Sequence, residues 1–395
     1  MRHDAVRRPI RFLFLGALTV LGAVAIAGAI GVAGASASSS ALAAATGGRA
    51  VIVIEGGGST HPFTTPWASC DDGRPSYIQE LVDSGLPVFT APGYGNASTS
   101  TDRRTGCPPQ PPLAVQWNTS GYPTQAGQAV LGLLGYLHAT YGYRTFDLIG
   151  YSYGGLVARA TIAALKERPA AGAFAPGFSY ATAAQRADVR IPSLITINSP
   201  HLGSPTYDIA GDPRTYFRLV ASAWGKQFAS AGKGLVPYER DGGAGSIHVL
   251  ETAAHAKANP TGWDESQVGV LDGVKVTLMA GDYCGRSCGD ATTPPDASPT
   301  GRLRTDGTVP VYSQLMQVCP RACPAPPGSV YLPPGMLPKG VVRKTFPTVH
   351  SRYDALRLGL PAPLSVASNP EAIAYLRETL LARWRAVKAP LLPRP

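Results

Sequence analysis

The chain has 395 residues, of which 44% are apolar and only 15% are charged. Soluble proteins average about 45–50% apolar and about 25% charged residues, so this sequence can bury a core, and its composition argues against disorder. The length suits one large domain or two average ones. The 45 glycines and 37 prolines predict long irregular connections between the ordered elements.

The net charge of +10 lies mostly at the two ends of the chain. Residues 2–11 carry a net charge of +3 and residues 377–394 carry +4, which leaves +3 for residues 13–376. A nucleic-acid-binding protein concentrates its positive charge on one face or along one helix. This placement of charge therefore argues against a nucleic-acid partner.

Residues 1–45 have the pattern of a secretory signal peptide. A basic stretch ends at Arg11, residues 12–34 are uncharged, and small residues follow, with cleavage expected after Ala37 or Ala43. An uncleaved membrane anchor is the alternative, because 23 uncharged residues exceed the roughly 18 at which a span becomes plausible. Eleven of the 23 are Gly or Ala, so the segment is weakly hydrophobic and cleavage is favoured. Either way, we expect a secreted or cell-surface protein.

From residue 50 onward, short β-rich runs alternate with helical patterns, as in a parallel sheet covered by helices. The predicted elements, in chain order, are strand 50–54, helix 76–84, strand 87–91, helix 125–141, strand 145–150, helix 154–166, strand 193–198, strand 275–280, strand 341–346 and helix 369–387. The last helix has Pro370 in its first turn, where a missing amide is harmless. The fold class is therefore α/β, with a mostly parallel central sheet and helices on both faces.

Three segments interrupt this alternation, near residues 92–123, 205–234 and 282–340. We interpret them as ordered surface insertions in a single domain that spans residues 46–395. In the second, an apolar helical face could form a lid over a lipid-binding pocket or pack as an ordinary helix, and both interpretations stay open. That face would consist of Phe217, Val220, Ala221, Trp224 and Phe228.

Six cysteines are spread over the chain, at positions 70, 107, 284, 288, 319 and 323. Export to an oxidising compartment favours disulfides, which would pin the insertions near them. Their order along the chain suggests that Cys70 pairs with Cys107 and that the other four form one local cluster. Zinc bound by those four thiolates is the weaker alternative.

The strand at 145–150 runs into Gly150-Tyr151-Ser152-Tyr153-Gly154 and then into a helix. A G-x-S-x-G motif between a strand and a helix is typical of a nucleophile elbow, in which a serine is held at a sharp, strained turn. Glycines two residues to either side are needed because larger side chains would collide with the adjacent strand or helix. Ser152 is therefore the candidate nucleophile.

A serine hydroxyl needs a base to take its proton and a carboxylate to orient that base. In a sheet of this kind the chain order is Ser, acid, His. Of the seven histidines only His350 follows late enough, in a loop after the last predicted strand. The acid is expected after the strand at 275–280, where Asp282 is nearest in sequence and Asp306 is the rival.

The sequence resembles secreted bacterial lipases and esterases of the α/β-hydrolase fold. The resemblance rests on three segments, residues 146–159 around Ser152, Ser199-Pro200-His201-Leu202-Gly203-Ser204, and Asp306-Gly307-Thr308-Val309-Pro310. In that family an Asp-Gly-x-Val-Pro run carries the catalytic aspartate, so the resemblance favours Asp306 over Asp282.

The oxyanion hole is expected to combine the amide of Tyr153 with an amide from the loop after the first strand. By position the second donor is Gly57, with Gly58 next. The family usually has His-Gly where this chain has Glu55-Gly56, but a backbone amide does not depend on that side chain. A carboxylate buried at Glu55 would need partners.

These observations predict an exported serine hydrolase that cleaves carboxylic esters. The expected substrates are acylglycerols or other lipid esters, met by transient contact with a lipid interface. The chemistry implies no cofactor and no metal. Acyl transfer to an alcohol and polyester hydrolysis are alternatives on the same scaffold. An alternative of another class is a cell-surface binding module that keeps the fold without activity.

Overall fold

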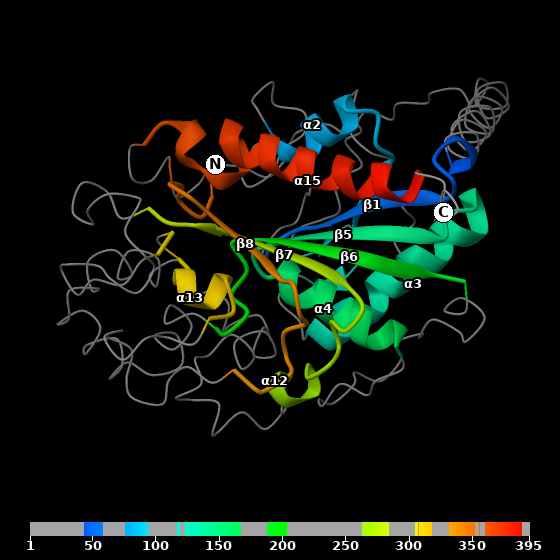
Figure 1. Ribbon diagram of the computed structural model, residues 1–395, viewed down its shortest axis with the longest axis horizontal. Coiled ribbons are helices and arrows are strands. Elements are labelled where there is room, and N and C mark those ends of the chain that lie inside the picture. Colours follow the sequence, from blue (N-terminus) through cyan, green and yellow to red (C-terminus); the bar gives the residue numbers. More distant parts are fainter. Residues whose placement is uncertain are drawn as a thin grey trace, which may run out of the picture.

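A six-stranded parallel sheet forms the centre of the computed structural model (Figure 1). The structure describes residues 43–57, 76–91, 93–94, 117–118, 123–166, 188–203, 263–283, 305–306, 308–317, 332–351, 355 and 360–388. The strands lie in the order β2-β1-β5-β6-β7-β8. Their bounds are β1 Arg49–Ile54, β2 Val88–Ala91, β5 Thr145–Tyr151, β6 Arg190–Ile197, β7 Lys275–Gly281 and β8 Val342–Phe346. The predicted parallel α/β architecture is confirmed.

Helices cover both faces of the sheet (Figure 1). On one face lie α2 (Tyr77–Asp83) and α15 (Pro370–Lys388), and on the other lie α3 (Pro123–Tyr141) and α4 (Gly154–Leu165). β1 shows why two layers are needed, because all six of its residues are buried. Val51 and Val53 pack in the cluster with α2 and α15, whereas Ile52 and Ile54 pack with α3 and α4. A strand buried on both faces has the continuous apolar run seen in the sequence.

Several short elements lie outside the predicted alternation. These are β3 Gly93–Tyr94, β4 Trp117–Asn118, α12 Trp263–Ser266, α13 Val311–Gln314 and the two 3-10 turns Ala362–Leu364 and Val366–Ser368. β3 and β4 form a separate two-stranded sheet within the first predicted insertion. That insertion ends earlier than expected, because α3 begins at Pro123, and proline is well tolerated in a first helical turn.

An ion pair in the core joins the sheet to the last helix. Asp147 of β5 is fully buried, and its Oδ2 accepts hydrogen bonds from Arg49 Nε and Trp384 Nε1, each at 2.7 Å. Its Oδ1 accepts from Arg49 Nη2 at 2.9 Å and from the hydroxyl of Ser193. The carboxylate of Asp147 thus connects β1, β5, β6 and α15.

Three expectations fall on residues outside the described part of the chain. They are most of the predicted signal segment, the six cysteines with their disulfide or zinc interpretations, and the candidate lid near residues 205–234. Within the described residues, no helix has both the length and the apolar character to cross a membrane.

Candidate active site

Ser152 sits at a sharp turn between β5 and α4. Its φ is +52°, in the left-handed region that side chains other than glycine rarely adopt. The flanking glycines make the turn possible. A Cβ on Gly150 would lie 2.5 Å from the Cα of Gly155, and one on Gly154 would lie 2.1 Å from the carbonyl oxygen of Ile54. The turn has the strained strand-to-helix geometry of a nucleophile elbow, and a serine at such a turn after a strand of a parallel sheet is the arrangement found in the α/β-hydrolase fold.

The structure brings Ser152, His350 and Asp306 together from three separate loops. His350 Nε2 lies 2.9 Å from Ser152 Oγ, and His350 Nδ1 lies 2.7 Å from Asp306 Oδ2. Ser152 follows β5, Asp306 follows β7 and His350 follows β8, so all three stand at the carboxyl ends of parallel strands. Asp306 is 0% exposed and His350 4%, which keeps this chain of hydrogen bonds largely out of water.

The aspartate is held on both sides of its carboxyl group. Oδ1 accepts backbone N–H bonds from Thr308 at 2.9 Å and Val309 at 2.7 Å, which leaves Oδ2 to face the imidazole. The backbone amide of His350 also donates to the carbonyl oxygen of Asp306 at 2.9 Å. Burial raises the pKa of Asp306, and the His350 ring and the two amides offset part of that effect. With Nδ1 donating to the carboxylate, Nε2 faces Ser152 Oγ with its lone pair and can accept the serine proton.

The rival acid lies elsewhere in the same loop region. Asp282 directly follows β7, and its backbone amide donates to the carbonyl oxygen of Phe346 at 2.8 Å. The carboxylate beside His350 Nδ1 is that of Asp306. His201, from another of the resembling segments, lies buried behind the turn, where its Nε2 is 2.9 Å from Thr196 Oγ1. Burial and the nearby Arg159 lower the pKa of His201.

Two further side chains hold the loop that carries His350. The hydroxyl of Tyr151 donates to the carbonyl oxygen of His350 at 2.6 Å, and Asn198 Nδ2 approaches the same oxygen at 3.4 Å. The Tyr151 and His350 rings are 5.7 Å apart between centroids. Sequence reasoning missed both residues. The signals available were the place of Tyr151 inside the G-x-S-x-G motif and that of Asn198 at the end of a predicted strand.

The loop after β1 passes directly over Ser152. A Cβ on Gly56 would lie 2.9 Å from Ser152 Cβ, so only glycine allows this approach. Gly57 is the next residue of that loop, and Tyr153 directly follows Ser152 and stands at the N-cap position of α4. Both predicted oxyanion donors therefore lie in segments that adjoin Ser152. Gly58, the second choice, falls outside the described residues.

Glu55, the first residue of this loop, is fully buried beside Tyr77 of α2. Burial raises the pKa of Glu55 well above its ordinary value, and the Tyr77 hydroxyl offsets only part of that effect. The pKa of Tyr77 is raised in turn, by burial and by the Glu55 carboxyl. The environment thus favours the protonated form of Glu55. Among the described residues, no group of three or more His, Cys, Asp or Glu side chains is placed to hold a metal ion.

Residues 133–215 match the sequence family described as "Putative serine esterase (DUF676)". The matched segment includes β5, the Ser152 turn, α4 and β6. No curated protein matches the sequence significantly.

Solved structures of similar architecture have low identity to this chain. The mature Bacillus licheniformis lipase BlEst2 is 11% identical, with a TM-score of 0.36, over 78% of this chain and 89% of its own. Lipase 1 from Pelosinus fermentans is 12% identical, with a TM-score of 0.38, over 84% and 98% respectively. The RedJ thioesterase of the prodiginine pathway of Streptomyces coelicolor is 13% identical, with a TM-score of 0.36, over 84% of this chain and 85% of its own. The family match at the nucleophile turn is what supports a serine hydrolase of ester bonds in general.

Proposed function

We propose that this protein is a serine hydrolase that cleaves carboxylic esters through a Ser152–His350–Asp306 triad. The observation that carries the proposal is the unbroken hydrogen-bonded chain from Asp306 through His350 to Ser152, with Ser152 on a strained turn. A serine hydroxyl at such a turn, beside a base that is itself oriented by a buried carboxylate, is arranged for nucleophilic attack.

The reaction proceeds through an acyl-enzyme. Ser152 Oγ attacks the ester carbonyl carbon while its proton passes to His350 Nε2, and Asp306 steadies the imidazolium that forms. The amides of Tyr153 and Gly57 donate to the oxyanion of the tetrahedral intermediate. The intermediate collapses, and His350 returns the proton to the departing alkoxide. Water, activated by His350, then releases the carboxylic acid and regenerates Ser152.

For the substrate we propose acylglycerols or other lipid esters, met by transient contact with a lipid interface. The support is the sequence resemblance to secreted bacterial lipases and esterases. Acyl transfer to an alcohol and hydrolysis of a polyester use the same triad and differ in how well water is excluded. We also propose that the protein is exported, from the signal-peptide pattern of residues 1–45.

A panel of p-nitrophenyl esters with short to long acyl chains tests the activity. Purified protein is expected to hydrolyse at least one of them, and Ser152→Ala is expected to abolish hydrolysis. No hydrolysis, or hydrolysis unaffected by Ser152→Ala, favours the inactive binding module. Formation of an acylglycerol when glycerol is added to the assay would identify a transferase.

The matched pair Asp306→Asn and Asp282→Asn tests the acid. We expect kcat to fall by about four orders of magnitude at Asp306, because the wrong imidazole tautomer is then favoured. Asp282→Asn is the control and should leave kcat within about threefold of wild type, less than 1 kcal/mol in barrier height. A large loss at Asp282 alone would reverse the assignment.

A further inference from the structure

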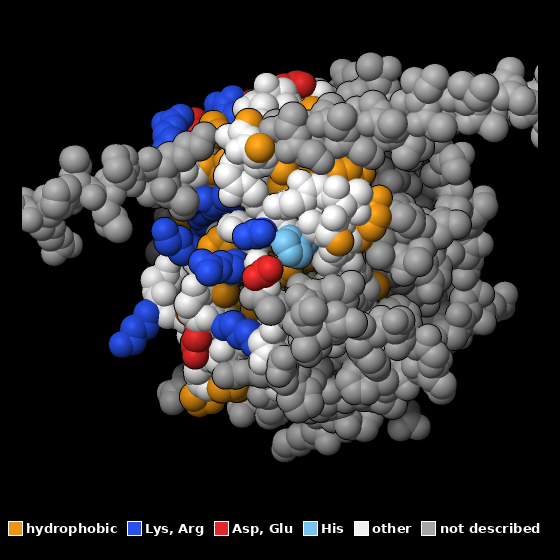
Figure 2. All heavy atoms as spheres, turned by 90° about the vertical axis from the view of Figure 1, so that its right-hand side faces the viewer, with side chains coloured by type: hydrophobic (Ala, Val, Ile, Leu, Met, Phe, Trp, Pro, Cys, Tyr) orange, Lys and Arg blue, Asp and Glu red, His pale blue; other side chains and the backbone are white. Residues whose placement is uncertain are grey.

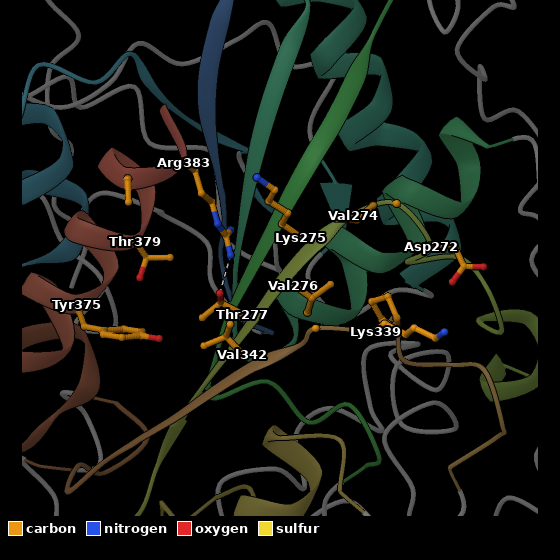
Figure 3. A pocket seen from close by; sticks show the side chains of 14 residues that line it. Asp272, Val274, Lys275, Val276, Thr277, Lys339, Val342, Tyr375, Thr379 and Arg383 are labelled. Carbon is orange, nitrogen blue, oxygen red and sulfur yellow. Dashed lines mark hydrogen bonds between the residues drawn. The ribbon is translucent and has the colours of Figure 1, made fainter. Parts of the chain in front are cut away.

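A cavity of about 770 Å³ lies between β7, the start of β8 and α15 (Figure 3). It is far from Ser152, at the opposite end of the sheet. Lys275, the first residue of β7, lines the cavity, whereas Gly281, the last, packs near Asp306. Seven residues of extended strand separate the two sites by roughly 20 Å. The ester-cleaving site therefore does not include this cavity.

Positive side chains predominate in the lining. Arg383 enters from α15, Lys275 from β7 and Lys339 from the segment before β8, against one carboxylate, that of Asp272. Figure 3 shows Asp272 near the Lys339 end of the cavity, away from Arg383. Neither lysine forms an ion pair with a described residue. Figure 2 shows that Lys and Arg also gather on the molecular face at the amino ends of the strands.

Arg383 has hydrogen-bonding capacity that the protein does not use. Its Nη2 donates to Thr277 Oγ1 at 2.6 Å, but its Nη1 is buried without a hydrogen-bond partner. Burial lowers the pKa of Arg383, and Asp147 offsets part of that effect. A charged N–H that lacks an acceptor is costly, so a shift of the Arg383 guanidinium toward an acceptor bound in the cavity would be favourable.

Asp147, the carboxylate that acts electrostatically on Arg383, cannot supply that acceptor. Both oxygens of Asp147 are already occupied, by two bonds from Arg49 and one each from Trp384 and Ser193. The guanidinium groups of Arg49 and Arg383 therefore share the one negative charge of Asp147. Lys275 adds a further positive charge to the lining of the cavity. The excess of positive charge has no counterpart among the described lining residues near Arg383.

We propose that this cavity binds a tetrahedral oxyanion of the phosphate type, with Arg383 and Lys275 as its charged contacts. The lining also includes Thr379 and Tyr375, which lie on the same side of the cavity as Arg383 (Figure 3). A phosphate group offers several acceptor oxygens and up to two negative charges, which suits this set of donors. Free phosphate and the headgroup of an anionic phospholipid share this chemistry.

Isothermal titration of the full chain with inorganic phosphate, at fixed ionic strength in chloride, tests the site. The variants are Arg383→Gln and Lys275→Gln, and the control is Arg385→Gln, which removes an exposed arginine from the same helix outside the cavity. Each cavity variant is expected to weaken phosphate binding by at least about tenfold, the effect of one lost charge-assisted contact. The control should bind within about twofold of wild type, because only the general field changes.

Cosedimentation with vesicles of phosphatidylglycerol, against vesicles of phosphatidylcholine, distinguishes the two sources. Binding of phosphate that depends on Arg383 and Lys275 supports a free-phosphate site. Binding only to phosphatidylglycerol, with the same dependence, supports a headgroup site. No binding in either experiment, or binding that both variants leave unchanged, overturns the proposal. Circular dichroism checks the fold of each variant. If Arg383→Gln unfolds, Lys275→Gln still tests the site, because Lys275 is exposed. Binding is measured without an ester, so failure of the proposed hydrolase activity leaves the result intact.

Discussion

Tyr151 lies beside Ser152 and holds the loop that carries His350, the proposed base. Its hydroxyl donates to the His350 carbonyl oxygen, so Tyr151→Phe removes one anchor of the His350 loop. We expect kcat to fall by about tenfold with KM nearly unchanged, since an imidazole displaced by a fraction of an ångström transfers the proton poorly. Stability should fall by about 1 kcal/mol, the net value of one hydrogen bond. Steady-state kinetics and urea unfolding measure the two effects.

Tyr136→Phe is the matched control, because Tyr136 lies on α3, away from the triad. An unchanged kcat in Tyr151→Phe, together with the loss of stability, would mean that the bond serves the fold alone.

Glu55 makes the stability of the fold depend on pH. Its pKa in the folded state is raised by burial, so the folded protein holds this proton more tightly than the unfolded chain does. The stabilisation is complete below the ordinary carboxyl pKa and is lost as the pH rises toward the folded-state pKa. We expect Glu55→Gln, a neutral side chain of the same shape, to flatten this decline. Urea unfolding at a series of pH values from 5 to 9 measures it, and equal slopes for both proteins would contradict the expectation.

At the scale of elements, the contact between α3 and α4 depends on one glycine. A Cβ on Gly127 would lie 2.6 Å from the carbonyl carbon of Ala160, so the two helix backbones touch there. Alanine in a helix normally gains about 1 kcal/mol over glycine. Here we expect Gly127→Ala to destabilise the protein by about 1–3 kcal/mol, because the helices must separate. Thermal unfolding measures the loss.

Gly85→Ala gives the comparison without a steric clash. Gly85 has a φ of +75° and open space around its Cβ position, so only backbone strain of about 1–2 kcal/mol applies. A stability gain in Gly127→Ala would show that α3 and α4 can repack without cost.

The sequence predicted the strands well where an apolar run marked them, and less well where the chain departs from that pattern. β6 begins at Arg190, three residues before the predicted start, because Pro192 and an exposed arginine hide the strand. The pairing of β5 with β6 shifts register between Thr145 and Asp147, and Pro192 lies opposite that irregularity, where no ladder amide is required. α12 and α13, with four residues each, are too short to show helical periodicity.

Chain order and motif context led to Ser152, Asp306 and His350, which the structure places within hydrogen-bonding distance. The bond from Tyr151 to His350 could not be found that way, because 199 residues separate its two ends and no local pattern records it. The same holds for the Arg383 cavity, whose lining comes from β7, β8, α15 and the segments beside them.

At the scale of the whole molecule, the hydrogen bonds and the ion pair of Asp147 connect β1, β5 and β6 with the last helix, α15. Asp147→Asn would leave the buried Arg49 guanidinium without its counter-charge, and such a change costs about 3–5 kcal/mol. We expect that loss in urea unfolding, with kcat of the folded protein unchanged, since Ser152 lies at the other end of β5. The surface pair of Lys344 and Glu371, 3.9 Å apart and exposed, offers the control, because Glu371→Gln should cost under about 1 kcal/mol. Equal losses of stability in Asp147→Asn and Glu371→Gln would show that the buried ion pair does not stabilise the fold more than the surface pair does.

β8 ends the described sheet, and its exposed residues bear on self-association. Val342, Arg343 and Lys344 are all exposed on this outer strand. Unpaired backbone groups on an outer strand can recruit a strand from another molecule, and basic side chains there deter such pairing, because two copies repel one another as they approach. We therefore expect the two cations of β8 to oppose the pairing of this outer strand with a strand of another molecule.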